Sequence, residues 1–329
     1  MLYDLIAVGS ATKDIILTTD RGKIFRTPKN KLAPKWLGFE LGEKICVNNA
    51  VKNIGGVAAN VAIGTKKLGL NSTLITTLGR DSHKNWVVKE LKKHKVDVSL
   101  IKINFQRESP LSTILVDQKT GERIIFYEKS SGEIDLSSLG KIKSKWFCVS
   151  SLTGDWSKQS EKILGVVKKQ KASLILAPST SQIIDGFVDL KKMLKWSKII
   201  LLNYNEALEI AAKLKLPAKD IKDLVKILHK LGPKVVCLTD GINGAYASNN
   251  SGILHCPASK VKVIDTTGAG DAFMSGFLGF FLKNKSLGES LKAGIANSAS
   301  VVRYTGTTKG LLTQKEILKK IKSLEAKEI

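Results

Sequence analysis

The stretch "DTTGAGDAFMSGFLGFFL", residues 265–282, places two aspartates six residues apart around a Gly-Ala-Gly turn and continues into an apolar segment. Glycines expose backbone N–H groups, and the first N–H groups of a following helix lack intrahelical partners. Such a helix start attracts anions. Beside these donors, the Asp271 carboxylate can accept a proton from an attacking hydroxyl, or it can simply cap the helix. The flanking glycines and the second aspartate favour the chemical role.

Other phosphate-binding sequences are absent. No Gly-x-x-x-x-Gly-Lys-Ser/Thr occurs, and "GSATKD", residues 9–14, is not a Gly-x-Gly-x-x-Gly. Phosphate chemistry would therefore need another binding site, and the 265–282 stretch supplies one, where the N–H groups of Gly268, Ala269 and Gly270 can converge on a phosphoryl group.

Along the chain, short β-rich runs alternate with longer amphipathic segments, which is the pattern of a parallel sheet covered by helices. We expect strands in residues 5–10, 72–79, 146–151, 173–179, 198–203 and 235–241. We expect helices in residues 60–70, 85–96, 160–171, 205–215 and 221–232.

Two regions, residues 14–53 and 100–128, break this alternation with strand-like runs that have no helices between them. The runs are residues 14–19, 38–47, 111–117 and 123–128. They predict a small antiparallel sheet that projects from a single domain spanning residues 1–329. Such a sheet could act as a lid that excludes water from a reacting site, or it could be only extra edge strands.

The composition is that of an ordinary globular protein with 43% hydrophobic residues. The first residues lack a basic region followed by a long apolar core, and the run "AFMSGFLGFFL" is too short to span a bilayer. We therefore expect a cytoplasmic protein without membrane partners. The four cysteines are far apart without a Cys-x-x-Cys pair, so we expect buried free thiols.

The net charge of +24 raises the question of nucleic-acid binding. Only six of the 53 basic residues are arginine, the side chain that reads bases and grips phosphates bidentately. The lysines are scattered among acidic residues, so no specific nucleic-acid partner is expected. The charge can still steer anionic ligands toward the protein.

Two motifs resemble those of the ribokinase-like pfkB carbohydrate kinases, a family that includes nucleoside kinases. "DTTGAGDAF" is similar to the family signature near the C-terminus, and residues 54–81 are similar to the N-terminal signature. The resemblance implies a ribokinase-like three-layer α/β/α fold with a central mostly parallel sheet and a small β-sheet lid. It also implies a kinase that transfers the γ-phosphoryl group of ATP to a primary hydroxyl of a small sugar or sugar derivative.

The resemblance also implies roles for individual residues. Asp271 would be the general base, and Gly268, Ala269 and Gly270 would form an anion hole. The acceptor would be bound by four residues near the start of the chain: Asp14, Gly55, Gly56 and Asn60. A carboxylate and an amide suit this task because they hydrogen-bond to vicinal hydroxyls.

The nucleotide and the ions would lie near the later strands. The Asn-x-x-Glu motif implies that Asn203 and Glu206 act on Mg²⁺ and the phosphates, although the same letters form a helix capping box. Three residues would approach the nucleotide: Thr239, Gly241 and Asn297. Asp265 and Thr267 match positions that line a monovalent-cation site in some members, and K⁺ dependence stays open.

The substrate is where the chain departs from the family pattern. Val57 follows Gly56, where many members have a more polar step, and Lys129 lies in the lid region, where it could reach an anionic or polyhydroxy substrate. A nucleoside kinase is the nearest alternative, with Trp36, Phe39 and Phe126 as contributors to a base pocket. A non-catalytic binding protein is a more distant one. A monomer and a homodimer through the lid both fit the sequence.

Overall fold

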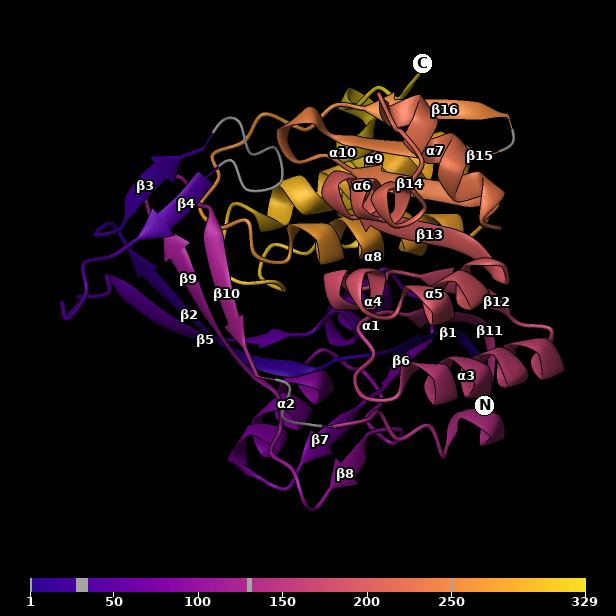
Figure 1. Ribbon diagram of the computed structural model, residues 1–329, viewed down its shortest axis with the longest axis horizontal. Helices are drawn as coiled ribbons and strands as arrows, with labels where there is room; N and C mark the ends of the chain where they lie inside the picture. Colours follow the sequence, from indigo (N-terminus) through magenta and orange to yellow (C-terminus); the bar gives the residue numbers. More distant parts are fainter. Residues whose placement is uncertain (1, 28–34, 129–131, 250) are drawn as a thin grey trace.

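A central sheet of nine strands organises the computed structural model, which describes residues 2–27, 35–128, 132–249 and 251–329 (Figure 1). In this part of the chain the strands follow the order β17-β16-β15-β14-β13-β12-β11-β1-β6. In that order they comprise Lys327–Glu328, Gly252–Cys256, Ala245–Asn249, Val235–Thr239, Ser197–Asn203, Ser173–Leu176, Lys143–Val149, Leu2–Val8 and Ser72–Ile75.

The strands from β6 to β14 run parallel to one another, and β15, β16 and β17 extend one edge in antiparallel fashion. Parallel strands covered on both faces are almost continuously apolar, which explains why the sequence pattern located them. Their carboxyl ends meet at one edge, where ligands bind in open α/β sheets.

Helices cover both faces of this sheet. α1 (Val57–Lys67), α8 (Ala269–Phe281) and α9 (Leu287–Val301) pack on one face, in a core that includes Leu5. α3 (Trp156–Gln170), α5 (Phe187–Leu194), α6 (Tyr204–Lys213) and α7 (Ile221–Lys230) pack on the other, around Ile6. Neighbouring strand residues point to opposite faces, so both layers need apolar partners. The predicted three-layer α/β/α fold is therefore confirmed.

The remaining helical elements are short or lie at the periphery. They are α2 (Ser82–Lys93), α4 (Thr180–Ile184), α10 (Gln314–Lys320) and the 3₁₀ turns Leu139–Lys141, Gly241–Asn243 and Ile321–Ser323. No helix in the described ranges has the length and apolar character needed to cross a membrane.

A second, smaller sheet projects from the layered body (Figure 1). This small sheet has the order β10-β9-β2-β5 and comprises Arg123–Tyr127, Leu111–Asp117, Thr12–Thr19 and Asn49–Gly55. β2 and β9 are parallel, and the other pairs are antiparallel. The hairpin of β3 (Lys23–Arg26) and β4 (Lys35–Gly38) lies beyond it.

Two details of this region differ from the sequence-based expectation. Residues 39–48 form no strand, because Gly42 takes a left-handed φ of 82° and most neighbouring side chains are exposed; the strand begins later, at β5. The sheet expected to be antiparallel is mixed, because β2 and β9 pair in parallel, and β8 (Lys102–Asn104), which was not among the expected runs, pairs with β7 (Thr77–Gly79) outside it.

Candidate active site

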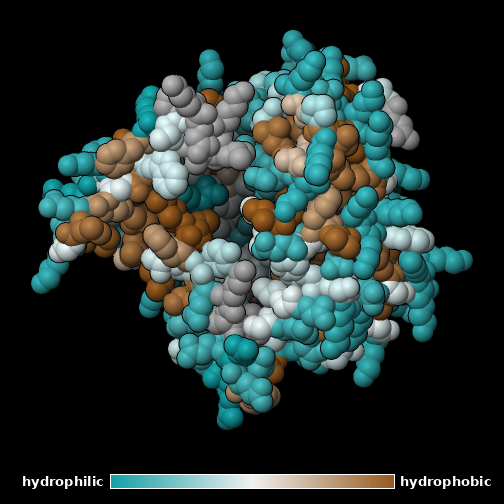
Figure 2. Space-filling view, viewed as in Figure 1, coloured by the Kyte–Doolittle hydropathy of each residue, from teal (hydrophilic) through white to brown (hydrophobic). Residues whose placement is uncertain are grey.

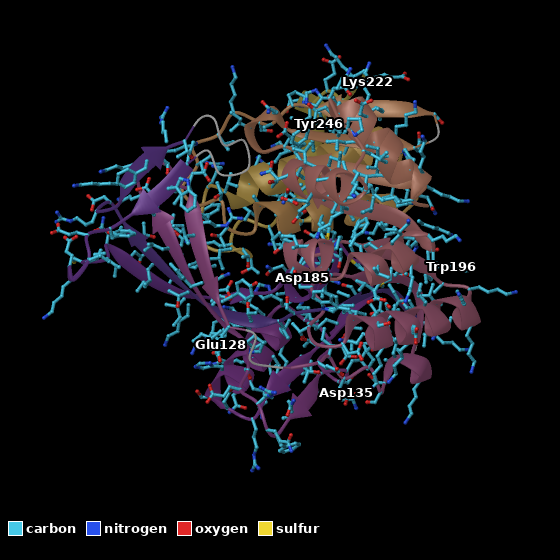
Figure 3. The ribbon with its side chains drawn as sticks, in the orientation of Figure 1. Glu128, Asp135, Asp185, Trp196, Lys222 and Tyr246 are labelled. Atoms are coloured by element: carbon cyan, nitrogen blue, oxygen red, sulfur yellow. The ribbon has the colours of Figure 1, made fainter. Side chains whose placement is uncertain are left out.

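A cavity of about 830 Å³ lies at the carboxyl ends of the parallel strands. Its lining comes from the ends of β1, β6, β11, β12, β13 and β14, from the first turn of α8 and from the small sheet. Glu128, directly after β10, also lines it (Figure 3). Apolar side chains gather over the small sheet in the space-filling view (Figure 2). The cavity therefore has one wall from each sheet.

The first turn of α8 opens into this cavity. Gly268 is the N-cap residue with a left-handed φ of 76°, and a Cβ atom there would lie 2.7 Å from the Thr307 backbone. Gly270 lines the cavity and has open space where a side chain would stand. These two glycines therefore leave the helix start accessible to an anion. Ala269 is different, because its N–H donates to the carbonyl of Thr266 at 3.2 Å; its predicted part in the anion hole is not supported.

The Asp271 carboxylate lies in the same turn and is held by α1. The Asn60 side-chain amide donates to Asp271 Oδ2 at 2.6 Å. Burial raises the pKa of Asp271, whereas the Asn60 hydrogen bond and the positive charge of Arg123 act in the opposite direction. A carboxylate with a raised pKa that faces a cavity can take a proton from a bound hydroxyl.

Asp14 comes from β2 and is only 5% exposed. Thr12 donates its hydroxyl to Asp14 Oδ1 at 2.7 Å, and burial raises the pKa of Asp14 to about 6. A Cβ atom on Gly55 would collide with this carboxylate, so glycine is required there. Gly56 lines the cavity and has a left-handed φ of 87°. A Cβ atom there would collide with the Ser10 carbonyl oxygen. The structure thus brings Asp14, Gly56, Asn60 and Asp271 to one cavity, with Gly55 directly behind Asp14.

Asn203 and Glu206 line the cavity at the end of β13. They form a reciprocal capping box for α6: each side chain accepts the other residue's backbone N–H at 2.8 Å. Burial raises the pKa of Glu206 to about 7, and the charge of Asp271 adds to this effect. Asn203 and Glu206 therefore both cap α6 and lie beside the cavity.

Other predicted nucleotide contacts divide into two groups. Thr239, at the end of β14, lines the cavity, whereas Gly241 is exposed outside its lining. Asn297 is 1% exposed, donates to Ala272 O and Ser275 Oγ, and accepts from the Leu312 N–H. These bonds tie α9 to α8, so the structure does not bring Asn297 to the cavity.

The predicted cation residues organise the turn before α8. Asp265 accepts the N–H of Thr267 at 2.8 Å and that of Gly306 at 3.0 Å. The buried Thr267 hydroxyl has no hydrogen-bond partner in the described structure, and Thr267 lines the cavity. Lys129, the predicted substrate contact, lies outside the described residues.

The aromatic residues expected for a base pocket are not the ones that face the cavity. Trp36, Phe39 and Phe126 are absent from its described lining, whereas Ile125 and Tyr127 of β10 are present. Alternate residues of a strand point to opposite sides, so Phe126 faces outward. The register of β10 decides which of these side chains face the cavity, and the sequence pattern of this short run did not determine that register.

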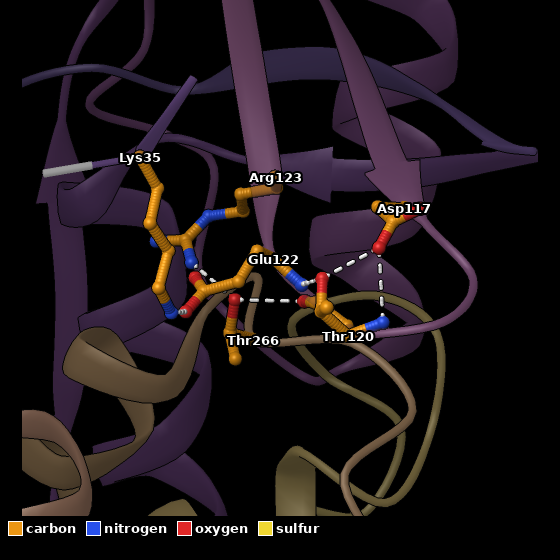
Figure 4. Close-up of polar contacts among 7 residues, drawn as sticks. Lys35, Asp117, Thr120, Glu122, Arg123 and Thr266 are labelled. Atoms are coloured by element: carbon orange, nitrogen blue, oxygen red, sulfur yellow. Dashed lines mark hydrogen bonds and ion pairs between the residues drawn. The ribbon is translucent and has the colours of Figure 1, made fainter. Parts of the chain in front are cut away.

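Sequence reasoning missed several polar residues of the cavity, among them Arg107, Arg123 and Thr307. No lysine lines the cavity among the described residues, and two of the six arginines are the cations of this described lining. Arg123 donates to Thr266 Oγ1 at 2.7 Å, which joins the small sheet to the turn before α8 (Figure 4). The scarcity of arginine in this lysine-rich chain was a usable signal for these two positions.

Comparison with known proteins agrees with this architecture. The curated ATP-dependent 6-phosphofructokinase of Thermoanaerobacterium thermosaccharolyticum is 29% identical, with 92% of this chain and 89% of that protein covered. A nucleoside kinase of Methanocaldococcus jannaschii is 26% identical over 86% and 90%. The structure of Arabidopsis thaliana ribokinase complexed with ribose and ATP superposes with a TM-score of 0.78 at 21% identity, covering 98% and 99%.

The layered fold is ribokinase-like, and the relatives that the chain matches over most of its length are kinases, which are phosphotransferases with an alcohol group as acceptor. The family description "pfkB family carbohydrate kinase" matches residues 30–314. The chain therefore belongs to the pfkB family of carbohydrate kinases. This membership sets aside the non-catalytic binding protein that the sequence left open.

Proposed function

We propose that the protein is an ATP-dependent, Mg²⁺-requiring kinase that phosphorylates a primary hydroxyl of a small sugar or sugar derivative. One observation carries the proposal. The Asp271 carboxylate and the glycine-rich start of α8 face the same cavity as Asp14 and Asn60, which are suited to hydroxyl groups. A base, an anion-binding helix start and a polyol-binding pair are the parts that this reaction needs.

The residues present fit MgATP as the phosphoryl donor. The helix start offers N–H donors of Gly268 and Gly270 to phosphate oxygens, and Gly270 leaves the approach open. Glu206 and Asn203 supply oxygen ligands of the kind that Mg²⁺ and its bound waters prefer. When bound, Mg²⁺ neutralises phosphate charge, and ATP supplies the γ-phosphoryl group.

The chain's own groups then account for the transfer. Asp14 and Asn60 orient the acceptor, and Asp271 takes the proton of its hydroxyl. The acceptor oxygen forms a bond to phosphorus while the bond from that phosphorus to the oxygen leaving with ADP breaks. The N–H groups of Gly268 and Gly270, and the positive charge of Arg123, offset the negative charge on the transferred group.

A nucleoside acceptor is the second candidate, and one observation favours it. Ile125 and Tyr127 are exposed on the cavity side of β10, where an apolar and an aromatic side chain could stack on a base. Its ribose would use the same Asp14 and Asn60.

K⁺ dependence is a further part of the proposal. Its support is the buried, unpartnered hydroxyl of Thr267 beside the Asp265 turn in the described structure. Activity measured in K⁺ and in a large organic cation, at equal ionic strength, tests it.

The acceptor is identified by ADP release from MgATP across ribose, fructose, sugar phosphates, 2-keto-3-deoxygluconate, adenosine and cytidine. A strong response to a sugar or sugar derivative supports the proposal, and a response to a nucleoside alone supports the second candidate. Folded protein that binds MgATP and phosphorylates none of them would contradict both.

A further inference from the structure

Thr307 lies in the turn after α9 and is only 3% exposed. The Asn53 side-chain amide of β5 donates to Thr307 Oγ1 at 2.9 Å. The hydroxyl lies 2.7 Å from the Ile54 carbonyl and 2.9 Å from Asn60 Oδ1, and its single proton is shared between these two acceptors. One buried hydroxyl therefore connects the small sheet to α1.

This hydroxyl bears on the orientation of the Asn60 amide. A hydroxyl has a single proton, and the donation from Asn53 leaves Thr307 to act as a donor toward Asn60 and Ile54. Asn60 therefore turns its oxygen to Thr307 and its NH₂ group to Asp271 Oδ2. The reversed amide would place its oxygen against a carboxylate, without a donor between them.

The position of Thr307 is itself fixed by packing. A Cβ atom on Gly268 would lie 2.8 Å from the Thr307 methyl group, so Thr307 packs against the N-cap residue of α8. The preceding residue, Gly306, donates its N–H to Asp265 Oδ2 at 3.0 Å. Thr307 thus touches the groups on both sides of Asp271: the helix start and Asn60.

We propose that Thr307 is a positioning residue for phosphoryl transfer, which fixes the Asn60 amide so that it donates to Asp271 and keeps this base ready to accept a proton. The inference deepens the proposed kinase function and rests on it. Nothing in the motif "DTTGAGD" indicates this residue, because it is 36 positions further along the chain.

The electrostatics of Asp271 are consistent with this role. Burial raises its pKa, and the Asn60 hydrogen bond is the first effect that opposes the rise. Four titratable groups of neighbouring elements also interact electrostatically with Asp271: Arg123 of β10, Asp14 of β2, Glu206 of α6 and Cys148 of β11. A Thr307 variant leaves all four in place, so a change in the titration of Asp271 reports on the Asn60 contact.

The test compares Thr307→Val, which keeps the shape and removes the hydroxyl, with Thr307→Ser, which keeps the hydroxyl. The pKa of Asp271 is measured without substrate by carbon NMR of the labelled aspartate carboxyl groups, assigned with Asp271→Asn. We expect the valine variant to raise that pKa by about half a unit or more, and the serine variant to leave it near the wild-type value.

Kinetics with the identified acceptor give the second readout. We expect Thr307→Val to lower kcat about tenfold, to move the acid limb of kcat/KM to higher pH and to leave MgATP affinity unchanged. We expect Thr307→Ser to keep the wild-type kcat and the wild-type acid limb of kcat/KM. A valine variant that melts earlier but keeps the wild-type Asp271 pKa and acid limb would show that Thr307 is only structural.

A failure of the inference about Thr307 can be distinguished from a failure of the proposed function. If Asp271→Asn turns over normally, the assignment of the base fails. If Asp271→Asn is inactive while Thr307→Val matches the wild type in pKa and rate, only the inference about Thr307 fails.

Discussion

At the scale of single residues, the cavity gathers carboxyl groups whose pKa values burial raises: Asp14 to about 6, Glu206 to about 7, and Asp271. Their proximity in one half-buried cavity opposes ionisation. In the unliganded protein, holding these charges lowers the free energy of unfolding, a cost that is common for groups with a function.

Asp14→Asn therefore makes the unliganded protein more stable at neutral pH. The folded-state pKa of about 6 lies above the unfolded value of 3.8, so the folded protein loses stability as pH rises between them, and the penalty remains above pH 6. Removing the charge should stabilise by about 1 to 3 kcal/mol at pH 7.5. At about pH 3.5 the folded state is protonated and so is most of the unfolded state, so the gain should fall to a few tenths of a kcal/mol. Urea unfolding at the two pH values measures it, and an equal effect at both would contradict the argument.

The residue scale is also where sequence reasoning was most uneven. Asp271 and Gly268 stand in one contiguous motif, so their types and spacing predicted them, whereas the resemblance to the family predicted Asn60. Thr307 and Arg123 reach the cavity only through tertiary structure. Asn297 carried an amide in a plausible helix, but the contact between α8 and α9 took it into the core.

At the scale of elements, β9 and β10 of the small sheet are docked onto the turn before α8 (Figure 4). Thr266 donates its N–H and its hydroxyl to the Gly121 carbonyl, at 3.1 and 3.0 Å, and accepts from Arg123. Asp117 accepts from the N–H and hydroxyl of Thr120, which shapes the β9–β10 turn. The turn before α8 and the strands β9 and β10 are thus joined by a few hydrogen bonds near solvent.

This contact yields a matched pair of variants. Arg123→Gln removes the charge near Asp271, so we expect kcat to fall about tenfold and the acid limb of kcat/KM to move to higher pH. Thr266→Val breaks the hydrogen bond but keeps the charge, so its acid limb should stay closer to the wild type. Identical pH profiles for both variants and the wild type would show that the guanidinium charge does not act on Asp271.

The elements themselves were largely predictable because buried parallel strands are short continuous apolar runs, whereas the helices repeat their apolar residues at helical spacing. The small sheet was less predictable from the sequence. Its strands are half exposed, and Gly42 ended one apolar run that resembled a strand. The pairing of β8 with β7 depends on contacts far apart in sequence, which no local pattern specifies.

At the scale of the whole molecule, the outer face of the small sheet and the β3–β4 hairpin expose large apolar side chains: Phe25, Trp36 and Phe126. Large exposed apolar side chains on a projecting part of a protein are typical of an interface. We therefore predict a homodimer through the small sheet. Light scattering should show a dimer that Phe126→Glu converts to a monomer; a monomeric wild type at high concentration would refute this.

The central claim is that Asp271 is the base in a phosphoryl transfer, and one measurement tests it most directly. Single-turnover transfer from MgATP to the identified acceptor is compared between the wild type and Asp271→Asn, with MgATP affinity determined for both by calorimetry. We predict a loss of transfer of at least about a thousandfold with MgATP affinity nearly unchanged. Transfer at the wild-type rate in Asp271→Asn would contradict the account.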